Sequence, residues 1–321
     1  MCHSVNDAVR VFGDLAPVTT LVIAGTVDLS GELAPSTVTH LRGASAAEAA
    51  MVGCTDASCA IPRVNFLTED ASLTLEGEEV TVEGVTLSAP SYANVAGVAL
   101  RLLASSVTLS GVTVSDFQTG DSSSAAVRVA GMGVVVDAPS QGATGGLESV
   151  VISDLVVDTS SVNVCQPVEV QGGGSSTNVT VERLRVVQGG SGMSCADTQW
   201  SALIVTNASS VVSTLLLMEA AAATHSSAGN RGLSQSAQGL MSCLTVYNAT
   251  TVEAGSTLVR GSGSKGHFSA ESSVVYSIHS VDMLLVSDVE AVGGGQDPSS
   301  LGQVVQASNV RSMTLQNMRL A

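Results

Sequence analysis

Apolar and polar residues alternate along much of this chain, and the alternation changes phase at recurring points. In residues 105–117, SSVTLSGVTVSDF, the apolar positions before and after Ser110-Gly111 each follow a period of two, but the two series are offset by one residue. Strict alternation is typical of a half-buried β-strand. A bend between two strands would let both apolar series point inward. We therefore predict two short strands separated by a bend at Ser110-Gly111.

The same kernel recurs along the chain, in the order apolar, any, small or polar, apolar, any, apolar. The copies begin at Val82, Leu109, Val129, Ile152, Val181, Val212, Val286 and Leu315. A poorly fitting copy lies near Val246. The copies start about 20 to about 40 residues apart, a period typical of solenoids with loops of variable length. A coil of three short strands and three turns needs roughly the shortest of these spacings.

Two alternative folds, a leucine-rich repeat and a β-sandwich, fit the sequence less well than a solenoid of strands. A leucine-rich repeat would need a fixed spacing of Leu and Asn, which the copies lack. A β-sandwich would show regularly spaced strands but no repeated kernel. Residues 213–225, STLLLMEAAAATH, are strong helix formers, so the kernel at Val212 could also be the start of a helix.

The composition supports a narrow, repetitive interior. Apolar residues make up 45% of the 321 residues but aromatic residues only 2%, so the core must consist of small and β-branched side chains. The formal net charge is −16 and Lys265 is the only lysine, which disfavours nucleic acid, anionic membranes and polyanions as partners. Long uninterrupted apolar runs are missing, so we predict no membrane span.

The two ends of the chain carry different signals. Val5, Val9 and Phe12 would share one face of a short helix, so we expect residues 1–17 to cap the open end of the solenoid. Residues 18–321 are then a single β-helix domain. The N-terminus does not read as a signal peptide. The chain stops inside the kernel that begins at Leu315, so we expect either that the protein continues or that its last coil associates end to end with a partner.

The cysteines favour an oxidising, extracellular or cell-surface setting, and the glycosylation sequons add little to that case. We expect a local disulfide between Cys54 and Cys59, and a second between Cys165 and Cys195, which lie about one repeat apart. The sequons are at Asn178, Asn207 and Asn248.

The kernels, the Ser and Asn corners, the N-terminal helix and residues 19–31, TTLVIAGTVDLSG, together resemble a known family. They resemble right-handed parallel β-helix proteins of the pectate-lyase-like superfold. The resemblance implies an all-β, right-handed parallel β-helix of roughly 10–13 coils with a short N-terminal capping helix. It implies little about activity, because this fold hosts lyases, hydrolases, adhesins and passive stalks.

The enzymatic motifs of that superfold are missing. Calcium-binding acids beside a basic Arg or Lys are expected of its lyases, and Lys265 has no acidic cluster near it in sequence. Asp-Asp and Arg-x-Lys motifs of the polygalacturonase-like branch are absent, so Lys265 and His267 are interpreted as loop residues. Trp200 is interpreted as a loop anchor rather than a sugar platform. No nucleophile elbow predicts a reactive Ser or Cys.

One weak constellation of carboxylates remains. Asp116, Gln188 and Glu219 lie seven positions after a kernel start, and Asp158 lies one position short of that. If they lined one corner, two carboxylates about 5 Å apart could serve a retaining glycosidase. Calcium is a related ligand for such a group. Corners face solvent, however, so a polar strand end is the stronger interpretation.

From the sequence we expect a non-catalytic extracellular or cell-surface scaffold without a cofactor, adhesive or in contact with a glycan. Its partner would be a carbohydrate or another protein, bound along the long side of the solenoid. The alternative is a polysaccharide lyase or glycoside hydrolase with degenerate motifs, for which Asp116, Asp158 and Glu219 are the weak catalytic candidates.

Overall fold

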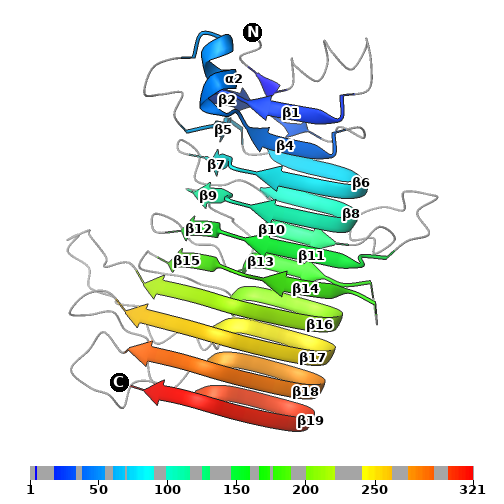
Figure 1. Ribbon diagram of the computed structural model, residues 1–321, viewed down its shortest axis with the longest axis vertical. Coiled ribbons are helices and arrows are strands. Elements are labelled where there is room, and N and C mark those ends of the chain that lie inside the picture. Colours follow the sequence, from blue (N-terminus) through cyan, green and yellow to red (C-terminus); the bar gives the residue numbers. More distant parts are fainter. Residues whose placement is uncertain are drawn as a thin grey trace.

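The computed structural model of the chain is a stack of strand rungs that follow one another along the long axis (Figure 1). The structure describes residues 4–5, 18–33, 38–54, 61–68, 71–89, 99–115, 125–130, 146–159, 166–173, 176–188, 200–220, 241–261, 274–292 and 303–320. The N-terminal rungs lie at one end of the stack and the C-terminal rungs at the other.

The nineteen strands of the described residues belong to one sheet, and every pairing among them is parallel. The early strands are β1 (Thr20–Ile23), β2 (Thr26–Leu29), β3 (Glu32–Leu33), β4 (His40–Gly43), β5 (Arg63–Phe66), β6 (Ser72–Glu83), β7 (Thr86–Ser88), β8 (Leu100–Ser110) and β9 (Thr113–Ser115). The later strands are β10 (Ala125–Ala130), β11 (Ser149–Ser153), β12 (Leu155–Thr159), β13 (Gln166–Gln171), β14 (Asn178–Val181), β15 (Leu184–Gln188), β16 (Trp200–Ala220), β17 (Met241–Gly261), β18 (Val274–Val292) and β19 (Gln303–Leu320).

The strands wind round the axis on three faces. Face 1 consists of β1, β4, the C-terminal parts of β6 and β8, β11, β14 and the middle of β16–β19. Face 2 consists of β2, β5, β7, β9, β12, β15 and the C-terminal parts of β16–β19. Face 3 consists of β3, the N-terminal parts of β6 and β8, β10, β13 and the N-terminal parts of β16–β19. This confirms the predicted all-β parallel β-helix.

Parallel, in-register pairing places equivalent residues of successive rungs directly above one another. On face 1, Val82 pairs with Leu109, Leu109 with Ile152, and Ile152 with Val181. All four side chains are fully buried. Because side chains in a strand alternate between its two faces, every second residue of each rung joins such an inward column. The columns fill the interior with Val, Leu, Ile and Ala, as the composition predicts.

The predicted bend at Ser110-Gly111 is the corner between face 1 and face 2. Gly111 has φ +62°, a left-handed conformation that costs other residues energy. Gly84 and Asp154 take the same conformation at this corner of neighbouring rungs, with φ +57° and +53°. One left-handed residue turns the chain and shifts its phase, so Val112 stays buried.

The structure corrects two kernel assignments and the helix alternative. Val129 lies on β10, in face 3, and so does not begin a corner between face 1 and face 2. Val181 pairs with Ser213 rather than with Val212, so Ser213 points inward and Val212 outward. The helix alternative at Val212 is wrong for the described residues, because β16 continues as strand to Ala220.

Two further kernels are clarified by the pairings. The segment near Val246 lies at the corner between face 3 and face 1, where Asn248 has φ +58°. The kernel that belongs in this rung begins at Ala254, which pairs with Ser213 and Val286.

The N-terminal end is described only in part. Residues 1–3 and 6–17 of the expected cap lie outside the described residues. Ser4 forms a parallel bridge with Asp28 of β2, and Val5 is buried in the core. The sequence analysis did not predict helix α2 (Ala46–Met51), which follows β4 and is capped by Ser45. No described helix is long and apolar enough to span a membrane.

Candidate functional site

Of the carboxylates singled out from the sequence, the structure places Asp158 and Glu219, and these two do not lie on adjacent rungs. Asp158 pairs with Val187, and Val187 pairs with Glu219, so these acids share a column of face 2 with a whole rung between them. Two rung spacings place their backbones roughly 10 Å apart. Gln188 pairs with Ala220 and belongs to the neighbouring column. Asp116 lies outside the described residues.

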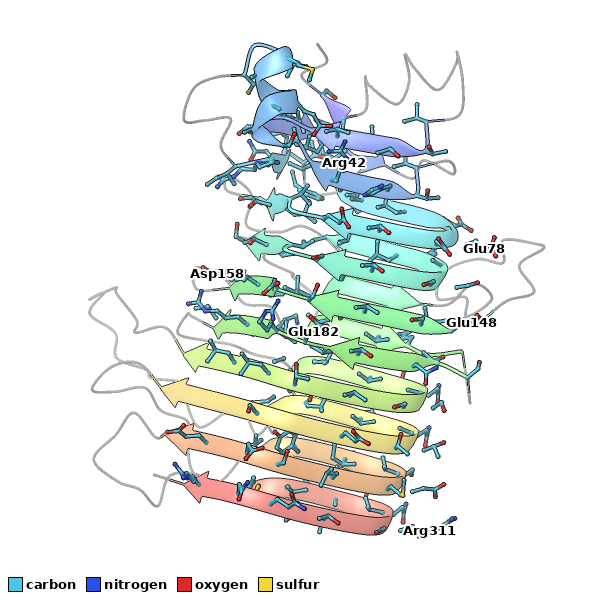
Figure 2. The ribbon with its side chains drawn as sticks, viewed as in Figure 1. Arg42, Glu78, Glu148, Asp158, Glu182 and Arg311 are labelled. Carbon is cyan, nitrogen blue, oxygen red and sulfur yellow. The ribbon has the colours of Figure 1, made fainter. Side chains whose placement is uncertain are left out.

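Other acidic residues are spread over the surface. In Figure 2, Glu78 and Glu148 lie along the edge where face 3 turns into face 1, Glu182 lies in the middle of the facing sheet, and Asp158 lies at the opposite edge. The described residues contain no group of three or more His, Cys, Asp or Glu that could hold a metal ion. Calcium binding therefore stays a prediction without a site in the described part of the chain.

The acids with clearly shifted pKa values serve the fold. Arg42 donates two hydrogen bonds to Glu48, at 2.6 and 2.8 Å, and with Ser45 it holds the pKa of Glu48 far below its ordinary value. Glu48 and Ser45 also form the capping box of α2. Hydrogen bonds from Arg183 lower the pKa of Asp154, the left-handed corner residue. Both pairs stay ionised and fix turns, so neither provides a general acid.

On the outer side of face 3, three polar side chains and one apolar side chain are buried in a row. Glu169 and Ile204 are 8% exposed, Thr245 1% and Ser277 0%. These residues follow one another in a single outward column. Two clusters on this side combine buried polar groups with hydrogen-bond partners, and they form the candidate site.

The first cluster lies on β8, β10 and β13. Arg101 pairs in register with Arg128, and Arg128 with Glu169, so two arginines and a buried carboxylate occupy successive rungs. The Gln171 amide donates a hydrogen bond to the Glu169 carboxylate. The sequence analysis did not single out these arginines. The signal it missed is that Arg101, Arg128 and Glu169 occupy the same register position of successive rungs.

The second cluster lies on β17, β18 and β19. The Tyr247 and His279 rings stack with their centroids 4.9 Å apart and their planes 11° from parallel. His279 Nε2 lies 2.9 Å from Ser277 Oγ, and His279 Nδ1 lies 2.7 Å from Ser308 Oγ. The sequence analysis missed this group. Tyr247, His279 and Ser308 each precede a left-handed corner residue, and that shared offset could have revealed it.

The corner beside this cluster forms a ladder of left-handed residues, which we call the asparagine ladder. Its members, with φ between +55° and +58°, are Asn207, Asn248, Ser280 and Asn309. Asn248 Nδ2 donates to Asn207 Oδ1 at 3.1 Å. The sequon residues Asn178, Asn207 and Asn248 are all exposed. Glycosylation at them stays a prediction.

The described cysteines are Cys54 and Cys243. Cys54 is disulfide-bonded, while Cys59, Cys165 and Cys195 lie outside the described residues, so both predicted pairings stay predictions. Cys243 is a buried thiol outside any disulfide, and burial raises its pKa to about 12, which makes it a poor nucleophile.

Three further residues from the sequence analysis have side chains outside the described part of the structure. Lys265 and His267 lie outside the described residues. Trp200 is the first residue of β16, and its side chain is not described.

Comparison with protein-family models, with curated proteins and with solved structures gave no match.

Proposed function

We propose that this protein is an extracellular or cell-surface scaffold that contacts a glycan along the outer side of face 3. The observation that carries the proposal is a straight array of hydrogen-bonding side chains, which we call the polar column. It comprises the outward residues at one position of five successive rungs: Gln171, Thr206, Tyr247, His279 and Ser308. Each is at least partly exposed.

The geometry of the polar column suits an extended, hydroxylated polymer. Neighbouring rungs are about 4.8 Å apart and rigidly paired, so the column offers donors and acceptors at a fixed repeat. Its side chains carry hydroxyl, amide and imidazole groups that hydrogen-bond neutral sugars. The net charge of −16 disfavours polyanions, so a neutral polysaccharide is the favoured ligand.

The test is retention on immobilised neutral polysaccharides, followed by titration calorimetry. Gln171→Arg combined with Thr206→Arg should weaken binding about tenfold or more, because bulky charged side chains would interrupt the column. The matched control is Thr108→Arg with Thr180→Arg, at outward positions of face 1. Wild-type protein that binds no glycan, or a control that loses binding equally, would contradict the proposal.

A second candidate function is a polysaccharide lyase or glycoside hydrolase. It is favoured by the succession of Arg101, Arg128 and the buried Glu169 at one register position, since a buried carboxylate in a row with basic residues is a candidate acid or base. Unsaturated-product and reducing-end assays, with and without calcium, should then show turnover that Glu169→Gln abolishes. Glu76→Gln, at a partly exposed outward position of the same face, should keep it. A wild-type protein without turnover would exclude this function.

A further inference from the structure

We propose that Ser308 and His279 form a nucleophile–base pair that transfers acyl groups from carboxylic esters. The pair lies on the outer side of face 3, where β18 and β19 run side by side. The inference goes beyond the contact role proposed above, because it assigns a reaction to two members of the polar column.

The imidazole of His279 is held from several directions. The ring of Tyr247 covers one of its faces, at a centroid distance of 4.9 Å. Its two nitrogens lie 2.9 Å from Ser277 Oγ and 2.7 Å from Ser308 Oγ. The ring therefore cannot turn without losing the stacking contact and both hydrogen bonds. A base fixed in this way meets the geometric requirement for general-base catalysis.

The two serines differ in access, and this assigns their roles. Ser277 is fully buried, whereas Ser308 is exposed, so only Ser308 can reach a substrate. A neutral imidazole has one N–H donor and one acceptor nitrogen. With the proton on Nε2, His279 donates to Ser277 Oγ, and its bare Nδ1 accepts the Ser308 hydroxyl proton. Ser277 then orients the base and Ser308 is the activated nucleophile, the arrangement general to such sites.

Gln306 supplies an independent sign that a ligand binds beside this pair. It pairs with Ser277 and lies two residues before Ser308, on the same side of β19. Its Oε1 atom is buried and has no hydrogen-bond partner. A buried acceptor without a donor is uncommon and calls for a partner. The hydroxyl group of a sugar ester would supply that donor, a step that rests on the glycan contact proposed above.

The reaction balances with water as the only co-reactant. Ser308 Oγ bonds to the carbonyl carbon of the ester while its proton passes to His279 Nδ1. The bond from that carbon to the alcohol oxygen breaks, and the alcohol leaves with the proton. Water then attacks the acyl-serine, His279 again carries the proton, and a carboxylic acid and free Ser308 result.

The experiment treats the full chain with a fluorophosphonate probe and, separately, with 4-nitrophenyl acetate. Peptide mass spectrometry should locate the phosphonyl group on Ser308. Ser308→Ala and His279→Gln should each reduce labelling and ester hydrolysis about a hundredfold or more. Ser312→Ala, at an exposed serine further along β19 on face 1, is the control and should behave as wild type. Circular dichroism checks that each variant is folded.

Unlabelled wild-type protein, a label on another residue, or an active Ser308→Ala variant would overturn the proposal. Glycan retention measured on the same samples separates the two proposals. Retention without labelling refutes the acyl transfer and leaves the contact role standing, whereas labelling without retention does the reverse.

Discussion

The rungs up to β15 and the last four rungs build the same solenoid in two ways. In the earlier part, most rungs are assembled from separate short strands, and glycines such as Gly84 and Gly111 turn the corner between face 1 and face 2. In the later part, β16–β19 are single strands of 18 to 21 residues that continue round both corners (Figure 1). Their corner residues are mainly Asn, Asp and Ser.

The two parts of the solenoid meet the cost of a left-handed corner residue in different ways. A left-handed residue other than glycine costs roughly 1–2 kcal/mol, and glycine avoids this cost. In the later rungs, side chains at the corner bond to the rung before them, as Asn248 does to Asn207 at 3.1 Å and Asn317 to Asp288 at 2.9 Å. These ladders offset the strain and also tie the rungs together.

A charge buried in the core should destabilise the earlier and the later rungs equally, and this is the largest loss of stability that we expect. Leu109 and Leu284 point inward and are 0% and 2% exposed. Leu109→Asp and Leu284→Asp should each cost more than about 4 kcal/mol, because an unpaired carboxylate would be buried. Thermal unfolding followed by circular dichroism measures this. An unchanged transition in either variant would refute its inward assignment.

The junction between the two parts should be sensitive to one methyl group. A Cβ atom on Gly172 would lie 2.0 Å from the Asn207 carbonyl oxygen of β16. Gly172→Ala should therefore cost about 3 kcal/mol through forced backbone shifts. Gly146→Ala is the control, because Gly146 is not left-handed and its added Cβ would have no contact closer than 3.5 Å. Chemical denaturation compares the two, and equal losses would mean that crowding at Gly172 is not the cause.

Substitutions at corner residues should distinguish the glycine corners of the earlier rungs from the hydrogen-bonded corners of the later rungs. Gly111→Ala should cost about 1–2 kcal/mol from backbone strain alone, since its Cβ would have no contact closer than 3.8 Å. Asn248→Gly should change stability by less than about 1 kcal/mol, because relief of strain offsets the lost hydrogen bond to Asn207. Denaturant midpoints would show this order. The reverse order would mean that the ladder bonds, rather than backbone strain, dominate at corners.

The smallest expected effect is a gain in stability from a substitution in the later rungs. Ser213 points inward, is 2% exposed, and its hydroxyl has no hydrogen-bond partner. Ser213→Ala should raise the free energy of unfolding by about 1 kcal/mol, because an unsatisfied buried hydroxyl is removed. Val179→Ala, at a buried neighbouring position, should lower it instead. A destabilised Ser213→Ala variant would indicate that the hydroxyl has a partner.

Local pattern predicted the strands and the corner at Gly111, because alternation and a small-residue bend are properties of one short segment. The register between rungs could not be predicted in the same way, since loops of unequal length separate the strands. That is why Val212 rather than Ser213 was assigned inward. The capping box formed by Ser45 and Glu48 was visible in the sequence and was overlooked.

The candidate site was less predictable than the fold. His279 and Ser308 meet only because β18 and β19 pair in register, and Arg128 comes into register with Glu169 only through the pairing of β10 with β13. No segment of sequence contains either pair, so a search for motifs could not find them. The alternating pattern predicts that the outer side of face 3 is solvated. It therefore could not predict that Glu169 and Ser277 are buried there.

The most direct test of the register is to place the same lysine at two adjacent positions of β16. Val212 points outward on face 1 beside Glu253, and Ser213 points into the core. Thermal unfolding should be nearly unchanged for Val212→Lys, while Ser213→Lys should lose more than about 4 kcal/mol or fail to fold. The opposite result, a tolerated Ser213→Lys and a severely destabilised Val212→Lys, would contradict the register on which the three faces are built.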